Sequence, residues 1–209
     1  MKIFQNFDLK ERNTLGLRAN TKYYTEPESV EELKAILSDD SYNEIPKMVM
    51  GEGSNILFTG DYTGLIIHPS IKDIRITDED ADYIYLRAGA GVVWDKLVEF
   101  AVDRGWGGIE NLSSIPGCVG AAPVQNIGAY GAEAKDTIFR VEYLTFEGLV
   151  DKTLSCEECR FGYRDSIFKR ELKGRGVITY VTFRLSKIPA INAGYEDVKQ
   201  AMKGVSEPT

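Results

Sequence analysis

Apolar side chains recur every three or four residues in two stretches of the chain, which is the spacing of an amphipathic helix. The first stretch follows Thr25-Glu-Pro-Glu28, where Thr25 is the expected N-cap and Pro27 lies in the first turn. The apolar face of this helix consists of Val30, Leu33, Ile36 and Leu37. The second helix is expected to end at Gly105, and its apolar face consists of Val93, Leu97, Phe100 and Ala101.

Short apolar and β-branched runs predict the strands. Residues 47–50 and 65–67 are short apolar runs, and we interpret both as buried strands. Later runs are richer in β-branched and aromatic residues and partly alternate with polar ones. They predict strands at 73–77, 83–88, 141–146 and 177–185, and a weak helical pattern covers 195–203.

The change from alternating strands and helices to mostly strands places a boundary near Pro69-Ser70. We therefore expect a small α/β lobe over residues 1–69 and a larger α+β lobe over residues 70–187. Residues 188–209 are polar and are expected to form a linker or the start of a missing substrate domain.

Composition and charge narrow the class of protein. The 209 residues are 43% hydrophobic and 27% charged, which is typical of a globular protein and excludes a disordered or fibrous chain. The sequence contains neither an apolar run of the roughly 18 residues that cross a bilayer nor a signal-peptide core, so we expect a cytoplasmic protein without membrane insertion. With 25 basic and 32 acidic residues the net charge is −7, which disfavours a nucleic-acid partner.

Residue types limit the chemistry further. A single histidine, His68, argues against a histidine-based metal site or nucleophile pair, and three cysteines are too few for a disulfide framework. Cys156-Glu-Glu-Cys159 has the spacing of a redox or metal pair, but the chain has no second pair and acidic neighbours raise thiol pKa values. We expect these cysteines to be structural and no metal to bind. Chemistry must then use a bound cofactor, arginine, tyrosine or carboxylates.

Two glycine-rich loops are candidate ligand sites. Gly51-Glu-Gly-Ser-Asn55 follows a predicted strand, and successive N–H groups in such a turn can hold a phosphate. The segment 111–131 has small side chains and hardly a charge, which fits backbone lying against a large flat ligand such as a dinucleotide. The alternatives are a simple tight turn for the first loop and a buried connection for the second.

A third candidate is Cys159-Arg-Phe-Gly-Tyr-Arg-Asp-Ser166. One arginine, held by Tyr163 and Asp165, could stabilise oxyanion charge on a carboxylate-bearing substrate. The alternative is that Arg160 and Arg164 only solvate the surface or pair with neighbouring acids.

Together these segments resemble the UDP-N-acetylenolpyruvoylglucosamine reductases, the MurB family. The matching pieces are Asn13-Thr-Leu-Gly16, Gly51-Glu-Gly-Ser-Asn-Ile-Leu-Phe58, Ile115-Pro-Gly-Cys-Val-Gly120, Gln125-Asn-Ile-Gly-Ala-Tyr-Gly131 and Glu158-Cys-Arg-Phe-Gly-Tyr-Arg-Asp-Ser-Ile-Phe-Lys169. The resemblance implies a two-lobed α+β fold like that of vanillyl-alcohol oxidase, with FAD bound non-covalently between the lobes. It further implies that NADPH reduces FAD, and that the enolpyruvyl group of a UDP-sugar is then reduced to give UDP-N-acetylmuramate for peptidoglycan synthesis.

The resemblance also implies roles for individual residues. Arg164 matches the family's anion-stabilising arginine, and Tyr163 and Tyr195 are expected to bind substrate. The residues expected to bind FAD are Gly51, Glu52, Gly53, Ser54, Asn55, Ser114, Ile115, Pro116, Gly117, Gly120, Ala121, Gln125, Asn126, Gly128 and Gly131.

The sequence departs from the family pattern in two places. The motif with the proton-donating serine and the glutamate near the family's C-terminus are both absent, and neither Ser206 nor Glu207 has the matching context. We therefore expect a monomeric FAD-binding portion that lacks full activity by itself. Two alternatives stay open: another flavin-dependent oxidase or dehydrogenase of the same fold, and a nucleotide-binding module without redox chemistry.

Overall fold

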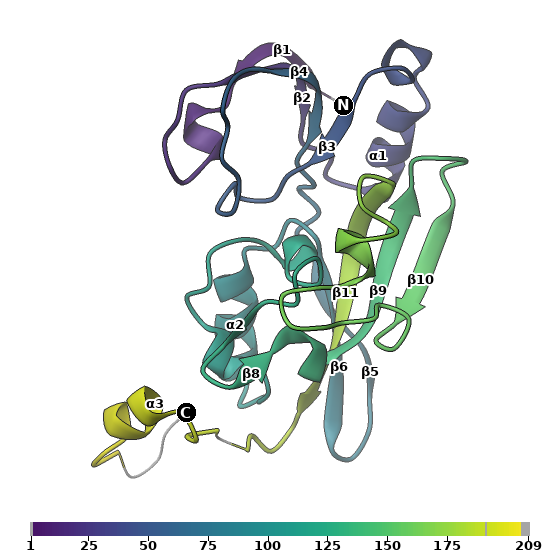
Figure 1. The fold of residues 1–209 in the computed structure, drawn as a ribbon. Helices are drawn as coiled ribbons and strands as arrows, with labels where there is room; N and C mark the ends of the chain where they lie inside the picture. Colours follow the sequence, from purple (N-terminus) through teal and green to yellow (C-terminus); the bar gives the residue numbers. More distant parts are fainter. Residues whose placement is uncertain (1, 191, 206–209) are drawn as a thin grey trace.

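The computed structural model describes residues 2–190 and 192–205, which form two main β-sheets and a small two-stranded one (Figure 1). The smaller sheet has the strand order β1-β2-β4-β3. Its strands are β1 (Ile3–Asp8), β2 (Asn20–Thr25), β3 (Lys47–Val49) and β4 (Tyr62–Ile67). β2 and β3 flank β4 in parallel, and β1 pairs with β2 antiparallel. We call this sheet and helix α1 (Val30–Leu37) the small lobe.

The N-cap of helix α1 lies four residues after the predicted one. Thr25 is the last residue of β2, where it pairs with Ile67 and its hydroxyl donates to the carbonyl of Lys2. The N-cap is Ser29, whose hydroxyl accepts from the backbone N–H of Glu32 at 3.1 Å. The predicted Thr25 cap is therefore wrong, because strand pairing already engages that residue. The apolar face is confirmed: Leu33, Ile36 and Leu37 are buried.

The two short apolar strands of the small lobe differ in burial. Leu65, Ile66 and Ile67 of β4 are fully buried, as predicted. β3 lies at the edge of the sheet and Val49 is 37% exposed, so its prediction as a buried strand is wrong. An edge strand pairs with a neighbour on one side only, and β3 leaves its apolar side chains available to line a cavity.

The larger sheet is antiparallel, with the strand order β10-β9-β11-β6-β5. Its strands are β5 (Ile74–Glu79), β6 (Tyr83–Gly89), β9 (Ile138–Thr145), β10 (Asp151–Ser155) and β11 (Gly176–Ser186). Helix α2 (Trp94–Val102) packs on it, and the Trp94 ring meets Phe183 edge-on at 5.7 Å. We call this sheet and α2 the large lobe. The four strands predicted here are confirmed, and β10 was not predicted.

The first residue of α2 corrects its predicted apolar face. Val93 is the N-cap residue and is 43% exposed, while Trp94 is buried in its place. Leu97 and Ala101 are buried as predicted. Val93 lies outside the helix, so the 3.6-residue period does not govern its direction.

Helix α1 connects the two lobes. Its residues Leu33 and Ile36 belong to one buried cluster with Leu65 of the small sheet and with Leu144 and Val177 of the large sheet. Figure 1 shows α1 beside the upper ends of β9 and β11. The lobes therefore share a core, and the predicted α+β class is confirmed.

A short hairpin and a short helix complete the strands and α-helices. The two-stranded hairpin of β7 (Gly128–Ala129) and β8 (Ala132–Glu133) projects from the large lobe. Helix α3 (Glu196–Ala201) falls inside the weak helical pattern. In the part of the chain that the structure describes, every helix is too short or too polar to cross a membrane.

Candidate functional site

One cavity of about 570 Å³ lies between the two lobes, and both glycine-rich loops line it. Of the residues expected to bind FAD, those that line it are Gly51, Glu52, Gly53, Ser54, Asn55, Pro116, Gly117, Gly120, Ala121 and Gln125. The structure thus brings together two segments that are some sixty residues apart in sequence. Ser114, Ile115, Asn126, Gly128 and Gly131 are not among the lining residues.

Loop 51–55 rests on the small lobe. Gly53 has a φ of +66°, and a Cβ atom there would lie 2.2 Å from the carbonyl oxygen of Arg12. The buried Asn13 fixes this neighbouring turn, because its side-chain amide donates to the carbonyls of Leu9 at 2.7 Å and Leu17 at 2.9 Å. Position 53 therefore requires glycine because the loop packs against residues 12–13, whatever ligand it holds.

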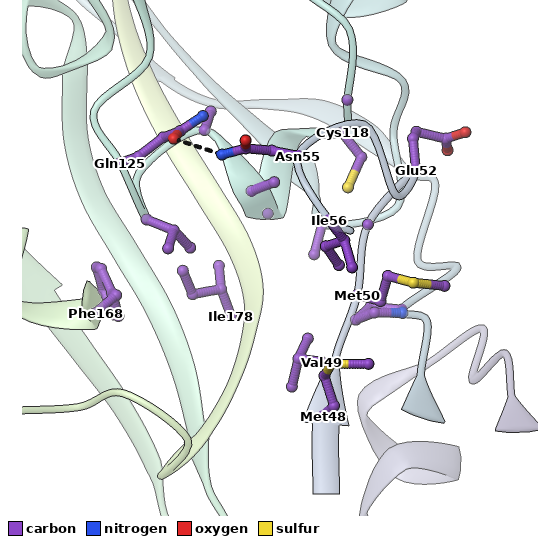
Figure 2. Close-up of a pocket in the computed structure, with 18 of the residues that line it drawn as sticks. Met48, Val49, Met50, Glu52, Asn55, Ile56, Cys118, Gln125, Phe168 and Ile178 are labelled. Carbon is purple, nitrogen blue, oxygen red and sulfur yellow. Dashed lines mark hydrogen bonds between the residues drawn. The ribbon is translucent and has the colours of Figure 1, made fainter. Parts of the chain in front are cut away.

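Hydrogen bonds and close packing connect the two glycine-rich loops. The Asn55 side-chain amide donates to Gln125 Oε1 at 3.0 Å (Figure 2). The Ser54 hydroxyl donates to the Pro116 carbonyl at 3.3 Å. Gly51 packs so closely on Cys118 that an added Cβ would lie 2.7 Å from the thiol sulfur. These contacts close one end of the cavity and fix the spacing of its polar backbone.

The second loop is held by the large lobe. The backbone N–H of Trp94 donates to the Gly117 carbonyl at 2.9 Å, and the N–H of Gly120 donates to the Ala90 carbonyl at 2.9 Å. Gly117 has a φ of +131°, a conformation open only to glycine. The lack of charge in this segment therefore reflects backbone that is packed on α2 and on the end of β6 while facing the cavity.

The cavity walls beyond the loops are apolar. In Figure 2 the side chains of β3 and its continuation stand on one side, and those of β11 and the segment after Ser166 stand on the other. The apolar lining residues are Met48, Val49, Met50, Ile56, Tyr143, Phe168 and Ile178. Lys47, Lys169 and Lys173 also line it. Sequence reasoning missed these walls, because each strand contributes only one or two side chains.

The start of the second loop is fixed outside the cavity. Asp95, in the first turn of α2, accepts hydrogen bonds from the backbone N–H of Ser114 at 2.7 Å and from the hydroxyl of Ser113 at 2.8 Å. These bonds lower the pKa of the Asp95 carboxyl. Ser114, which has a φ of +62°, is therefore held in place by Asp95.

Arg164 lies on the β7–β8 hairpin. Its guanidinium donates to the carbonyl of Gly128 at 3.0 Å, and its backbone has a φ of +53°. The expectation that Tyr163 and Asp165 hold it is wrong. Asp165 pairs with Arg170, and Tyr163 is 86% exposed.

The turn that carries Arg164 is fixed by Asn126. This fully buried side chain donates to the Gly162 carbonyl at 3.0 Å and accepts from the backbone N–H of Lys135 at 3.0 Å. The ammonium group of Lys169 adds to this, because its Nζ donates to the carbonyl of Arg164 at 2.8 Å. Asn126, expected to bind FAD, is thus a structural support of the arginine.

Tyr195 contacts the same hairpin. Its ring meets that of Tyr130 edge-on, with centroids 5.5 Å apart. Asn111 holds both segments by donating to the carbonyls of Tyr130 at 3.1 Å and Asn192 at 2.9 Å. Arg164 and Tyr195 therefore share one platform outside the cavity lining, which we call the hairpin platform (residues 128–133).

The cysteines are free thiols. Burial raises the pKa of Cys159 to about 12, which leaves it protonated. Across residues 2–190 and 192–205, no three His, Cys, Asp or Glu side chains are grouped so that they could hold a metal ion.

The fold and its two glycine-rich loops define a class of protein. Residues 21–153 match the family described as FAD binding domain, and the chain belongs to this family. A VAO-type flavoprotein from Myceliophthora thermophila has the same fold, with a TM-score of 0.57 at 18% identity over 80% of this chain and 32% of its own.

The relatives that match along the whole chain are reductases. The chain is 42% identical over 209 residues to the UDP-N-acetylenolpyruvoylglucosamine reductase of Amoebophilus asiaticus and 43% identical over 212 residues to that of Flavobacterium johnsoniae. Each match covers 100% of this chain and 62% of the relative, so the chain spans less than two thirds of their length. The corresponding reductase structure, MurB from Thermus caldophilus, has a TM-score of 0.69 at 27% identity and covers 100% of this chain and 70% of its own. The resemblance drawn from the motifs is confirmed.

Proposed function

We propose that the chain is the FAD-binding part of an NADPH-dependent reductase that converts UDP-N-acetylglucosamine enolpyruvate to UDP-N-acetylmuramate for peptidoglycan synthesis. The observation that carries this proposal is that loops 51–55 and 116–125 meet in one cavity with apolar walls. Polar backbone beside apolar surface suits a ligand with both a pyrophosphate and flat rings.

The donor chemistry of the cavity fits FAD. Loop 51–55 would contact the pyrophosphate, and segment 116–125 would lie along the rest of the dinucleotide. Lysines at positions 47, 169 and 173 add positive charge around a ligand that carries two phosphates. When bound, FAD would supply the hydride chemistry that links NADPH to the enolpyruvyl group.

Arg164 is the proposed anion-stabilising residue. One guanidinium nitrogen is engaged by the Gly128 carbonyl, which fixes the side chain and leaves other N–H groups for a substrate. A positioned charged donor of this kind contributes on the order of 3 kcal/mol to transition-state stabilisation. Tyr163 and Tyr195 are the proposed substrate contacts, and both are exposed.

The whole reaction needs groups beyond those described. The chain spans 62% of the reductases it resembles, and the proposal assigns the proton donor and the second anion-stabilising group to sequence of the complete gene product. Ser206 and Glu207 lie outside the described residues. The proposal also includes lobes with boundaries at 1–69 and 70–187, a linker from 188, a monomer, and a cytoplasmic location.

An absorption spectrum tests the cofactor. The purified chain should show flavin bands or acquire them on titration with FAD. A chain that is folded by circular dichroism and stays colourless with excess FAD contradicts the proposal and favours a nucleotide-binding module.

Activity tests the reaction class. The complete gene product should oxidise NADPH only when the enolpyruvyl UDP-sugar is present, and the 209-residue chain should not turn this substrate over. Oxygen-dependent oxidation of small alcohols or hydroxy acids would instead identify an oxidase of the same fold.

A further inference from the structure

The only histidine of the chain lies behind the first glycine-rich loop. His68 follows β4, and its Nδ1 atom lies 3.1 Å from the carbonyl oxygens of both Met50 and Gly51. Since both partners are acceptors, Nδ1 must carry the hydrogen and share it between the two carbonyls. One side chain thus fixes two consecutive peptide groups at the corner where the chain leaves β3.

Because His68 holds the Met50 and Gly51 carbonyls, it also determines the direction of the N–H groups that follow them. In a trans peptide the C=O and the following N–H point in opposite directions, and the described residues contain no cis peptide. The N–H groups of Gly51 and Glu52 therefore point away from His68. The Glu52 N–H approaches the thiol of Cys118, whose pKa is raised by burial and only partly lowered by this N–H.

In the described part of the chain, a ligand has only one weak competitor for these two N–H groups, the Cys118 thiol beside the Glu52 N–H. Within residues 2–190 and 192–205, no backbone or side-chain oxygen accepts a hydrogen bond from either of them. Both residues line the cavity between the lobes. Consecutive N–H groups that point the same way, beside a glycine, form an anion-binding concavity.

The imidazole ring is itself held in place. Its backbone N–H donates to the Thr25 carbonyl at 2.9 Å, and its ring lies nearly parallel to that of Tyr24, with centroids 6.5 Å apart. Tyr24 is fixed in turn, because its hydroxyl donates to Glu26 at 2.8 Å and Glu26 pairs with Arg12 at 2.7 Å. A ring locked in this way can hold the two carbonyls without losing its own freedom on binding.

We infer that His68 is a positioning residue for phosphate binding: by holding the Met50 and Gly51 carbonyls, it aims the Gly51 and Glu52 N–H groups at the pyrophosphate of the cofactor. This inference rests on the proposed function, since FAD is the ligand. His68 does not contact the cofactor itself; it acts through the loop.

Three substitutions of the purified chain test the inference. His68→Asn places an N–H donor at the δ position, His68→Gln places it one atom further out, and His68→Phe keeps the ring but removes the donor. The dissociation constant of FAD, measured by flavin fluorescence, should rise about tenfold in the Phe and Gln variants, because the carbonyls lose their donor. The Asn variant should stay within about threefold of wild type.

A second measurement separates positioning from a general structural role. Competition by ADP and by adenosine against FAD should show that His68→Phe weakens ADP, which carries phosphates, and leaves adenosine unchanged. Thr21→Val is the matched control: it removes a buried hydroxyl that donates to the carbonyls of Tyr23 and Gly64 in the same sheet but removes nothing from the loop or from the His68 ring, so it should leave the ADP affinity unchanged. If His68→Phe does not fold, the Asn and Gln pair decides.

The outcomes are distinguishable. FAD and ADP binding that is equal in wild type, Gln and Phe variants overturns the inference alone, as does equal weakening of ADP and adenosine. A folded wild-type chain that binds neither FAD nor ADP overturns the proposed function and this inference with it.

Discussion

The two ends of the segment 116–133 are both rich in glycine and alanine but lie at different places in the structure. Residues 116–125 pack on α2 and on the end of β6, and they face the cavity. The hairpin platform (128–133) projects from the large lobe and carries Arg164 and Tyr195. One continuous run of small residues therefore lines the cavity at one end and, at the other, contacts Arg164 and Tyr195, the side chains proposed to bind substrate.

The two ends are also stabilised differently. The cavity end is fixed by backbone-to-backbone contacts that only glycine and small residues permit. The platform end is fixed by the amide side chains of Asn126 and Asn111. Substitutions at the cavity end should therefore change FAD binding, and those at the platform end should change turnover.

The largest effect is expected on the cavity side, at Gly53. Gly53→Val would place a Cβ 2.2 Å from the Arg12 carbonyl in a left-handed conformation, which should cost at least about 3 kcal/mol and abolish FAD retention. Urea unfolding and flavin content measure the two effects. Gly60→Val is the control, since nothing lies within 4 Å of its Cβ position; a Gly53 variant that behaves like it contradicts the packing described above.

The next effect belongs to the platform. Arg164→Lys should lower turnover of the complete gene product about a hundredfold with FAD affinity unchanged, because a point charge cannot replace the planar guanidinium. Arg160→Lys is the matched control: Arg160 pairs with Glu171 at 2.9 Å, and its substitution should leave turnover as in wild type. If loss of flavin accounted for the whole Arg164 defect, the division between the two ends would be wrong.

Gln125 and Asn126 lie where the cavity end meets the platform end, so their substitutions test the difference between the two ends directly. Gln125→Ala removes the hydrogen bond to Asn55 and should weaken FAD binding by about 1 kcal/mol, roughly fivefold, with little change in turnover at saturating FAD. Asn126→Ala should do the reverse and lower turnover, because the arginine turn loses its buried support. Fluorescence titration measures FAD binding, and NADPH consumption measures turnover. If both variants changed the same quantity, the functional division between the two ends would be wrong.

The smallest effect is a pH dependence at the start of the cavity end. The hydrogen bonds from Ser114 and Ser113 lower the pKa of Asp95 below its unfolded value of about 3.9, so their contribution is present above that value. It is lost as the pH falls through the lower, folded-state pKa. Wild type should therefore lose more stability than Asp95→Asn when urea unfolding is repeated from pH 6 down to pH 3. Parallel curves would show that the carboxylate contributes nothing there.

Much of the fold was predictable from periodicity, and the omissions share a cause. Strands β5, β6, β9 and β11 of the large lobe and both amphipathic helices follow from runs such as 177–185 and from the spacing of Leu33 and Leu97. β1, β2 and β10 were not predicted. β1 and β10 are edge strands with mostly exposed side chains, so their sequences carry no burial pattern. β2 mixes lysine and threonine with its tyrosines and is fixed by pairing on both sides.

The sequence revealed the parts of the site whose backbone conformation or close packing requires glycine. Loops 51–55 and 116–125 could be found in this way, but which of their neighbours face the cavity could not. Val49 and Ile178 come from different sheets, and only the packing of the two lobes makes them opposite walls of one cavity. The partner of Arg164 is a backbone carbonyl, which leaves no mark on side-chain identity.

Helix α1 has one more consequence. Its apolar face contacts both sheets, so moving the lobes apart would expose Leu33 and Ile36 together with Leu144 and Val177 to water. The width of the cleft is thus set when the chain folds, and the two halves should melt as a single cooperative unit instead of swinging on a hinge.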